Sequence, residues 1–140
     1  MTEAQAILIL CAMLGGEAEH RVEYTLHAVT SHVRVDCVTD THAIEVGLDD
    51  TRSAYDSLHQ ATFNAHLLGL EPMVVLIDTD GIESQYEYQV ETVARTYGVA
   101  YATWDTDYLL RWQMTEPFRL RRDARSYPAA ACGKFLTDDQ

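Results

Sequence analysis

The sequence predicts an α/β sandwich, a three-layer-like arrangement around a mixed central sheet, and three patterns support this prediction. Apolar residues recur at helical spacing over residues 3–14 and 51–68. Apolar and polar residues alternate over residues 21–28, as they do in a half-buried strand. A continuous apolar run, MVVLID at residues 73–78, is typical of a central strand that is covered on both faces.

The first half of the chain is expected to supply one helix and three strands. Residues 3–14 (EAQAILILCAML) form the predicted helix, which ends at the Gly-Gly pair that follows it. A strand over 21–28 comes next, and the short turn TDT then joins two further strands at 33–38 and 42–47. Because the turn is so short, we expect these two strands to pair antiparallel.

The second half of the chain alternates helices and strands. A helix over residues 51–68 carries an apolar stripe, and the strand at 73–78 follows it. A helix over 83–97, a strand over 99–103 and a short helix over 107–112 come next. The residues of the third helix that are expected to face the core are Tyr86, Val90, Val93 and Tyr97. This order favours crossover connections, and hence parallel strands.

Composition and charge narrow the range of functions. A chain of 140 residues with 47% hydrophobic residues has the size and apolar content of one folded domain. We assign residues 1–112 to this domain and residues 113–140 to an irregular C-terminal tail. The formal net charge of -12 disfavours non-specific nucleic-acid binding, which depends on Lys and Arg.

The tail contains a cluster of basic residues: Arg119, Arg121, Arg122 and Arg125. This cluster either contacts phosphate or an acidic partner, or pairs with the chain's own acids.

The cysteines and the N-terminal segment predict a soluble protein from a reducing compartment. Cys11, Cys37 and Cys132 are widely spaced, so neither a disulfide framework nor a zinc site is indicated. Cys11 and Cys37 lie in apolar segments and are expected to be small buried hydrophobic residues. The apolar run at residues 6–14 is too short to span a bilayer, and no signal peptide or membrane contact is expected.

Two carboxylates fall among apolar residues in the segment VRVDCVTDTHAIEVGL, residues 33–48. Asp36 and Glu45 lie on either side of the turn, so antiparallel pairing brings both to the same end of the sheet. A buried carboxylate needs a partner, and two converging carboxylates make a hard oxygen site suited to Mg²⁺ or Mn²⁺. The alternative is that Asp36 caps a turn or pairs with Arg34 or Arg52 and that Glu45 faces water.

Asp36, Glu45 and the α-β-β-β-α-β order together resemble the PD-(D/E)XK nuclease superfamily, which has a restriction-endonuclease-like αβββαβ core. The run RVDCVTDTHAIEV is similar to a run in small proteins of this kind from bacteria and their phages. Three other segments are similar to segments of the same proteins: GGEAEHRVEY, HQATFNAHLLGLEP and MVVLI. The resemblance covers roughly residues 3–104, and TDTHAIEV is its most specific part.

The resemblance implies a set of site residues. Glu3 would be the acid of the first helix, and it would bind metal together with Asp36 and Glu45. Two acids further along the chain are substitutes for Glu3: Glu17 and Glu19. Gln60 would border the site from the following helix, its alternative being a surface amide.

The position of the superfamily's lysine, two residues after the Glu, is occupied by Gly47. The only lysine of the chain is Lys134, far along the tail. Arg52 is the nearby cation that would join the catalytic set, but its guanidinium cannot accept a proton at neutral pH. Catalysis is therefore expected to be weakened or lost. A lysine introduced at position 47 would point to the same face as Glu45 and is expected to raise cleavage.

Two functions from different classes remain open. The first is a Mg²⁺-dependent phosphodiesterase that acts on DNA, which the Asp36 and Glu45 pair with Gln60 favours. The second is a catalytically inactive, nuclease-derived binding or structural module, which Gly47 and the net acidity favour. Such a module would join protein partners or copies of itself, for example in a phage particle or a DNA-processing complex. Either function places the chain in the cytoplasm or in a virus particle.

Overall fold

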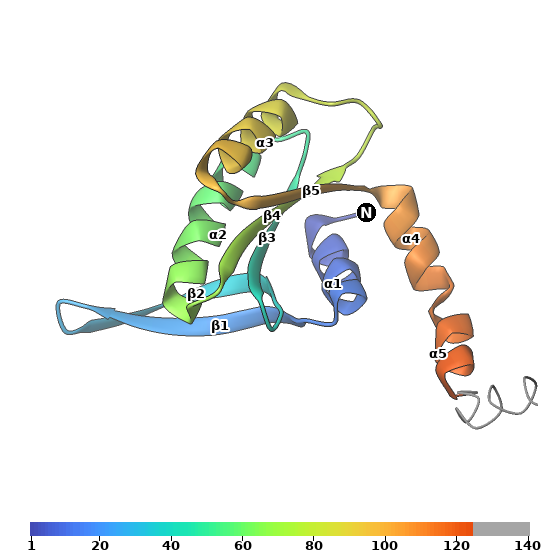
Figure 1. Ribbon diagram of the computed structural model, residues 1–140, viewed down its shortest axis with the longest axis horizontal. Coiled ribbons are helices and arrows are strands. Elements are labelled where there is room, and N and C mark those ends of the chain that lie inside the picture. The colour runs from blue at the N-terminus through green and yellow to red at the C-terminus, as the bar shows by residue number, and fades with distance from the viewer. Residues whose placement is uncertain (125–140) are drawn as a thin grey trace, which may run out of the picture.

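The computed structural model describes residues 1–124, with side chains through Leu120, as five strands and five helices (Figure 1). The strands are β1 Glu17–Leu26, β2 Val29–Val38, β3 His42–Leu48, β4 Glu71–Asp78 and β5 Ala100–Asp105. The helices are α1 Glu3–Leu14, α2 Ala54–Leu68, α3 Gln85–Tyr97, α4 Thr106–Met114 and α5 Glu116–Ala124. Their order along the chain is α1-β1-β2-β3-α2-β4-α3-β5-α4-α5.

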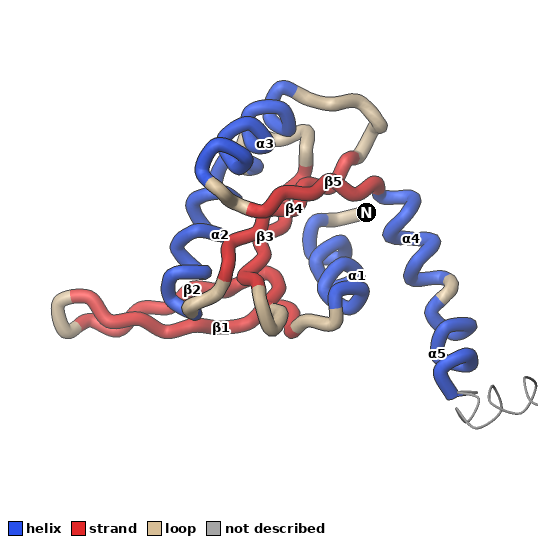
Figure 2. Tube along the Cα trace, viewed as in Figure 1, coloured by secondary structure: helices blue, strands red, loops and turns tan. Residues whose placement is uncertain are grey.

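The strands form one mixed sheet in the order β1-β2-β3-β4-β5 (Figure 2). β1 pairs antiparallel with β2 and β2 with β3, whereas β3, β4 and β5 are parallel. Short turns join the antiparallel strands, and α2 and α3 form the longer crossovers that parallel strands need. This topology confirms the predicted α/β sandwich with a mixed sheet, including the pairing of residues 33–38 with residues 42–47.

Helices cover both faces of the sheet (Figure 1). α1 packs on one face, where Leu10 is buried in the same cluster as Leu109 of α4. α2 and α3 pack on the other face, where Ala61 and Val90 are buried with Val74 of β4. β4 is therefore buried on both faces, which is why its sequence is continuously apolar. Within residues 1–124 no helix has the length and apolar content that crossing a membrane requires.

Local sequence signals set both ends of α1. The Thr2 side chain accepts a hydrogen bond from the Gln5 backbone while the Gln5 side chain accepts one from the Thr2 backbone, which is a capping box. Gly15 ends the helix in the left-handed conformation, with φ at 71°. At Gly16 a Cβ atom would lie 2.7 Å from Sγ of Cys37, so only glycine lets the chain turn this closely against β2.

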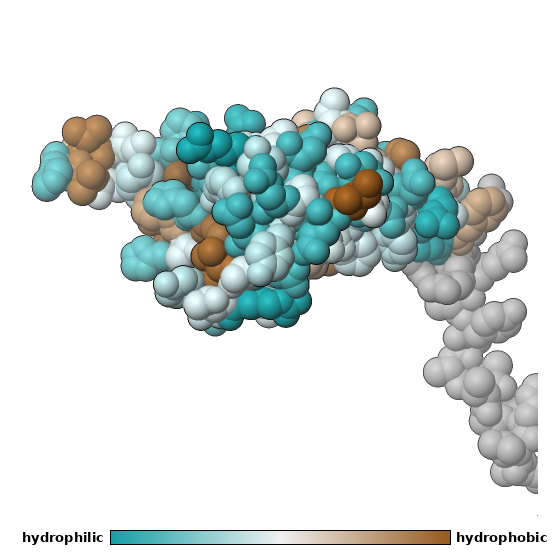
Figure 3. All heavy atoms as spheres, turned by 90° about the horizontal axis from the view of Figure 1, so that it is seen from above, coloured by the Kyte–Doolittle hydropathy of each residue, from teal (hydrophilic) through white to brown (hydrophobic). Residues whose placement is uncertain are grey.

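β1 and β2 form a long hairpin that projects beyond the rest of the sheet (Figure 1). Its turn residues, His27 and Ala28, have positive φ angles of 49° and 65°, the feature of a type I′ turn. The strand predicted at 21–28 wrongly included them because neither is the Gly or Asn that usually signals such a turn. The tip exposes Leu26 and Val29, and Figure 3 shows apolar atoms at this end of a largely hydrophilic face.

The buried face of α3 differs from the predicted one. Val90 is buried as predicted, but Val93 and Tyr97 are 43% and 78% exposed. Glu87 and Ala94 are buried in their place. The small side chain of Ala94 lets the helix approach the sheet closely, so packing rather than aromatic content sets the rotation of α3.

Cys11 of α1 and Cys37 of β2 form a disulfide, with their Cα atoms 5.5 Å apart. The prediction that both are reduced, hydrophobic residues is therefore wrong in its chemistry, although both are at most 1% exposed as predicted. The two cysteines are 26 residues apart, and their contact depends on how α1 packs across β2, so the bond could not be predicted from the sequence. The bond ties the first helix to the strand that carries Asp36.

The prediction of an irregular tail from residue 113 onwards is wrong for residues 116–124, which form α5. Arg119 stacks on the Trp112 ring, 3.9 Å from its centroid, and donates to the Trp112 carbonyl and to Oγ1 of Thr115. This arginine therefore stabilises the corner between α4 and α5. The other members of the basic cluster lie outside the described side chains: Arg121, Arg122 and Arg125.

Candidate functional site

Asp36 lies where β2 and β3 separate. The ladder between these strands comprises the pairs of Cys37 with Ile44 and of Val38 with Ala43. At the next position the Val46 amide donates to Oδ2 of Asp36 at 2.8 Å instead of to a backbone carbonyl. The carboxylate thus takes the place of a ladder acceptor and lies in the opening between the two strands.

Glu45 enters the same opening from β3 and is only 3% exposed. Its Oε1 accepts a hydrogen bond of 2.7 Å from the side-chain amide of Asn64, which projects from α2 and is itself buried. Asn64 falls on the stripe of α2 that also buries Ala61 and Ala65. An amide on a buried stripe of small residues is the sequence signal that marks Asn64, which was not among the predicted site residues.

The two carboxyl groups face each other closely enough to share a proton. Burial, and then the negative charge of Asp36, raise the pKa of Glu45 to about 8. Burial also raises the pKa of Asp36, with smaller contributions from the charges of Glu3 and Glu19, while the Val46 amide opposes this rise. At neutral pH the pair therefore retains a proton.

Among the described ion pairs, none joins an arginine to Asp36 or Glu45. Arg34, an alternative partner for Asp36, instead pairs with Glu19 at 3.1 Å. Arg52, assigned to the catalytic set, is exposed. Glu45 is thus buried beside a half-buried Asp36 without an ion-pair partner in the described part of the chain, and the alternative in which Glu45 faces water is wrong.

The other residues implied by the resemblance lie further from the pair. Glu3, at the start of α1, is exposed and acts on Asp36 through its charge. Gln60 is exposed on α2, and the hydrogen bond from this helix to Glu45 comes from Asn64, one turn later. The structure therefore brings Asp36 and Glu45 together and adds Asn64 to them.

Gly47 lies on the face of β3 that α2 covers. A Cβ atom at this position would lie 2.9 Å from Oγ of Ser57 and 3.0 Å from Cδ2 of Leu76. A lysine side chain at position 47 would therefore collide with α2, which argues against the prediction that it would raise cleavage. Glycine is needed here to let α2 pack closely on β3.

A second group of carboxylates gathers at the carboxyl ends of β3 and β4. Asp49, Asp78 and Asp80 each offer an oxygen atom, and these atoms all lie within 4.8 Å of one another, so the group could hold a metal ion. Asp49 is 1% exposed, and its Oδ1 accepts hydrogen bonds from the backbone and hydroxyl of Thr79. This group was not among the sites predicted from the sequence. Its signal is an acid at the end of successive parallel strands, whose carboxyl ends meet at one edge of the sheet.

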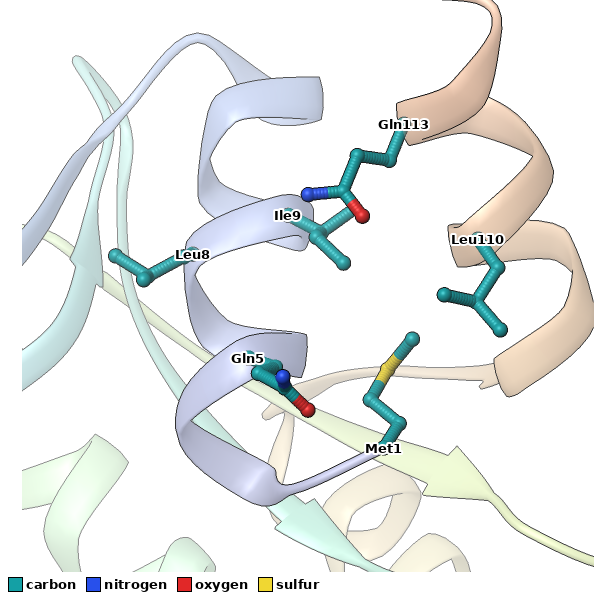
Figure 4. Close-up of a pocket in the computed structure, with 6 residues that line it drawn as sticks. All are labelled: Met1, Gln5, Leu8, Ile9, Leu110 and Gln113. Carbon is teal, nitrogen blue, oxygen red and sulfur yellow. The ribbon is translucent and has the colours of Figure 1, made fainter.

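A cavity of about 250 Å³ between α1 and α4 is lined by apolar side chains and two amides (Figure 4). Its lining residues are Met1, Gln5, Leu8, Ile9, Leu110 and Gln113. Because no ionisable side chain lines it, this cavity offers neither acid–base nor metal chemistry. The candidate sites in the described part of the chain are therefore the acid pair between β2 and β3 and the acid cluster at the carboxyl ends of β3 and β4.

No family model, curated protein or solved structure matches this chain.

Proposed function

We propose that this chain is a nuclease-like protein in which Asp36 and Glu45 bind Mg²⁺ or Mn²⁺, with phosphodiester cleavage weak or lost. The observation that supports this proposal is that a buried Glu45 faces a half-buried Asp36, and neither has an arginine or lysine partner among the described ion pairs. The αβββαβ order, with both acids at the point where β2 and β3 separate, agrees with the resemblance to PD-(D/E)XK nucleases.

The donor set of the pair suits a hard divalent cation. Oδ2 of Asp36 is held by the Val46 amide and Oε1 of Glu45 by Asn64, and Asp36 and Glu45 also hydrogen-bond each other, so a bound cation would replace this contact between the two carboxyl groups. Carboxylate oxygens are the ligands that Mg²⁺ and Mn²⁺ prefer, and a cation relieves the repulsion between two neighbouring acids. Binding requires loss of the shared proton, so we expect affinity to rise with pH through the pKa of Glu45.

The residues around the pair explain why catalysis would be weak. A bound divalent ion would supply an activated water and charge stabilisation for a phosphoryl group. A side chain that orients or deprotonates the water contributes a factor of about 10²–10⁴ to the rate. Position 47, where the superfamily has a lysine, offers no such side chain, because it is glycine and α2 fills the space beside it. Arg52 is exposed and remains protonated, so it can contribute only charge.

The second candidate is a catalytically inactive module for binding or assembly, which the burial of Glu45 specifically favours. A side chain that is 3% exposed cannot reach a phosphodiester unless α2 or β2 moves. The net charge of -12 also repels a DNA backbone. In this candidate the pair would stabilise the fold, with or without a cation.

Isothermal titration of Mg²⁺ and Mn²⁺ at pH 8 tests the proposal on the wild type, Asp36→Asn and Asp40→Asn. Asp40 is an exposed acid in the turn before β3, so its substitution is a matched control. We expect the wild type and the control to bind, and Asp36→Asn to bind at least tenfold more weakly. Equal affinity in all three proteins, or no binding in the wild type, would contradict the proposal.

A DNA-cleavage assay on the same proteins separates the two candidates. Weak cleavage that Asp36→Asn abolishes would support the nuclease-like function, and metal binding without cleavage would support the inactive module. Rapid Mg²⁺-dependent cleavage by the wild type would show that another group replaces the missing lysine, which would contradict the expectation of weak catalysis.

A further inference from the structure

The loop between β4 and α3 has the spacing of part of a calcium-binding loop. Residues 78–87, DTDGIESQYE, contain the pattern D-x-D-G-x₅-E. The twelve-residue EF-hand loop places acids at positions 1, 3 and 5, glycine at position 6 and a bidentate glutamate at position 12. Asp78, Asp80, Gly81 and Glu87 correspond to positions 3, 5, 6 and 12, whereas Leu76 stands at position 1 and is buried in the sheet.

Asp49 lies next to the loop in the folded structure and can replace the acid that is missing at position 1. It follows β3, which is parallel and adjacent to β4, and its carboxylate lies within 4.8 Å of those of Asp78 and Asp80. Oδ1 of Asp49 is held by Thr79, and Oδ1 of Asp78 accepts the amides of Asp80 and Gly81. These bonds leave the second oxygen of each carboxylate for a ligand.

Glu87 is an independent observation that points to a cation. Ser84 caps α3 by accepting the Glu87 amide, which places Glu87 where a glutamate ordinarily bonds back to the cap. Its side chain is instead buried, with 8% of the residue exposed, and its Oε2 has no hydrogen-bond partner within the described residues. The Ser84 hydroxyl, which accepts the Glu87 amide, also donates to the Asp49 carbonyl, so the first turn of α3 lies against Asp49. A buried carboxylate beside other acids is stable when a cation joins them.

We propose that Asp49, Asp78, Asp80 and Glu87 form a Ca²⁺ site at the carboxyl edge of the sheet. Ca²⁺ takes six to eight oxygen ligands in flexible geometry, including a bidentate glutamate, whereas Mg²⁺ demands a near-ideal octahedron. An open pocket gives solvent access to two of these acids, Asp78 and Asp80, and Asp105, Asp107 and Arg111 also line it. Arg111 forms no ion pair with these acids within the described part of the chain. This site is separate from Asp36 and Glu45 and does not depend on their function.

Calcium titration by calorimetry tests the site in the full-length wild type and in two substituted proteins, Asp80→Asn and Glu87→Gln. Both substitutions keep side-chain size and remove one ligand charge, and an asparagine in place of Asp80 still accepts the Ile82 amide. We expect the wild type to bind Ca²⁺ with a Kd below about 1 mM, the weak limit of natural calcium modules. Each substitution is expected to weaken this binding at least tenfold, and Ca²⁺ is expected to raise the Tm of the wild type more than that of either substituted protein.

Two control variants assign the result to this site. Asp36→Asn alters only the other carboxyl pair and is expected to leave Ca²⁺ affinity unchanged. Tyr101→Phe removes a second buried polar atom that has no hydrogen-bond partner within the described residues, and it is also expected to leave Ca²⁺ affinity unchanged. The proposal is overturned if the wild type neither binds Ca²⁺ nor shows a Tm shift, or if Glu87→Gln binds as tightly as the wild type. It is equally overturned if Asp36→Asn abolishes binding.

Discussion

Replacing Glu45 with glutamine is predicted to stabilise the metal-free protein at alkaline pH. The glutamine side chain retains an oxygen that accepts the Asn64 amide, and it adds an amide that can donate to Asp36. The substitution thus keeps the size and hydrogen bonds of the site but removes a charge that forms when the buried pair loses its proton. The effect must therefore depend on pH.

The size of this effect follows from the shift in the pKa of Glu45. The pKa is about 8 in the folded protein and 4.5 is its ordinary value, which we take for the unfolded chain. Because the folded state holds the proton more tightly, the stabilisation is complete below pH 4.5 and is lost as the pH rises through 8. At about 1.4 kcal/mol per pH unit between these values, the loss reaches at most about 5 kcal/mol.

Urea unfolding of the wild type and Glu45→Gln in EDTA, at half-unit steps from pH 5 to pH 9, measures this loss. We expect similar free energies of unfolding near pH 5 and a steadily growing advantage for Glu45→Gln up to about pH 8. Glu71→Gln, at an exposed position on β4, is the matched control and should follow the wild type. If the difference between wild type and Glu45→Gln is constant over this range, Glu45 does not hold a proton at neutral pH and the reasoning fails.

Three further predictions concern packing, covalent bonding and hydrogen bonding. Gly47→Ala is expected to lower the free energy of unfolding by about 1–3 kcal/mol through overpacking, with Gly47→Lys worse and no gain in DNA cleavage; urea unfolding and the cleavage assay check this. Replacing Cys11 and Cys37 together with alanine opens the loop closed across 26 residues and should cost about 3.5 kcal/mol by loop entropy, whereas unchanged stability, or a wild type that reacts as free thiols, would refute the bond. Asn64→Leu removes the donor to Glu45 and should destabilise the protein by about 1–3 kcal/mol at pH 8 but less at pH 5, measured by thermal unfolding.

The order and type of the elements follow from local patterns in the sequence. The spacing of apolar residues, every 3.6 residues in a helix and every second residue in a strand, indicates which face of each element is buried. The turn TDT is too short for a crossover, so β2 and β3 must pair antiparallel. The same turn is why the proximity of Asp36 and Glu45 could be predicted. A contact between residues that a short turn joins can therefore be predicted from the local sequence alone.

Contacts between elements that are distant in sequence depend on the tertiary structure. The choice of Asn64 rather than Gln60 as the partner of Glu45 depends on how α2 rotates about its axis and packs against Gly47. The disulfide of Cys11 depends on where α1 crosses β2. The second carboxylate group exists because parallel strands end at one edge of the sheet, which brings together acids from separate strands. Helix rotation and sheet order are set by close packing of the whole core, and no local pattern of residues encodes them.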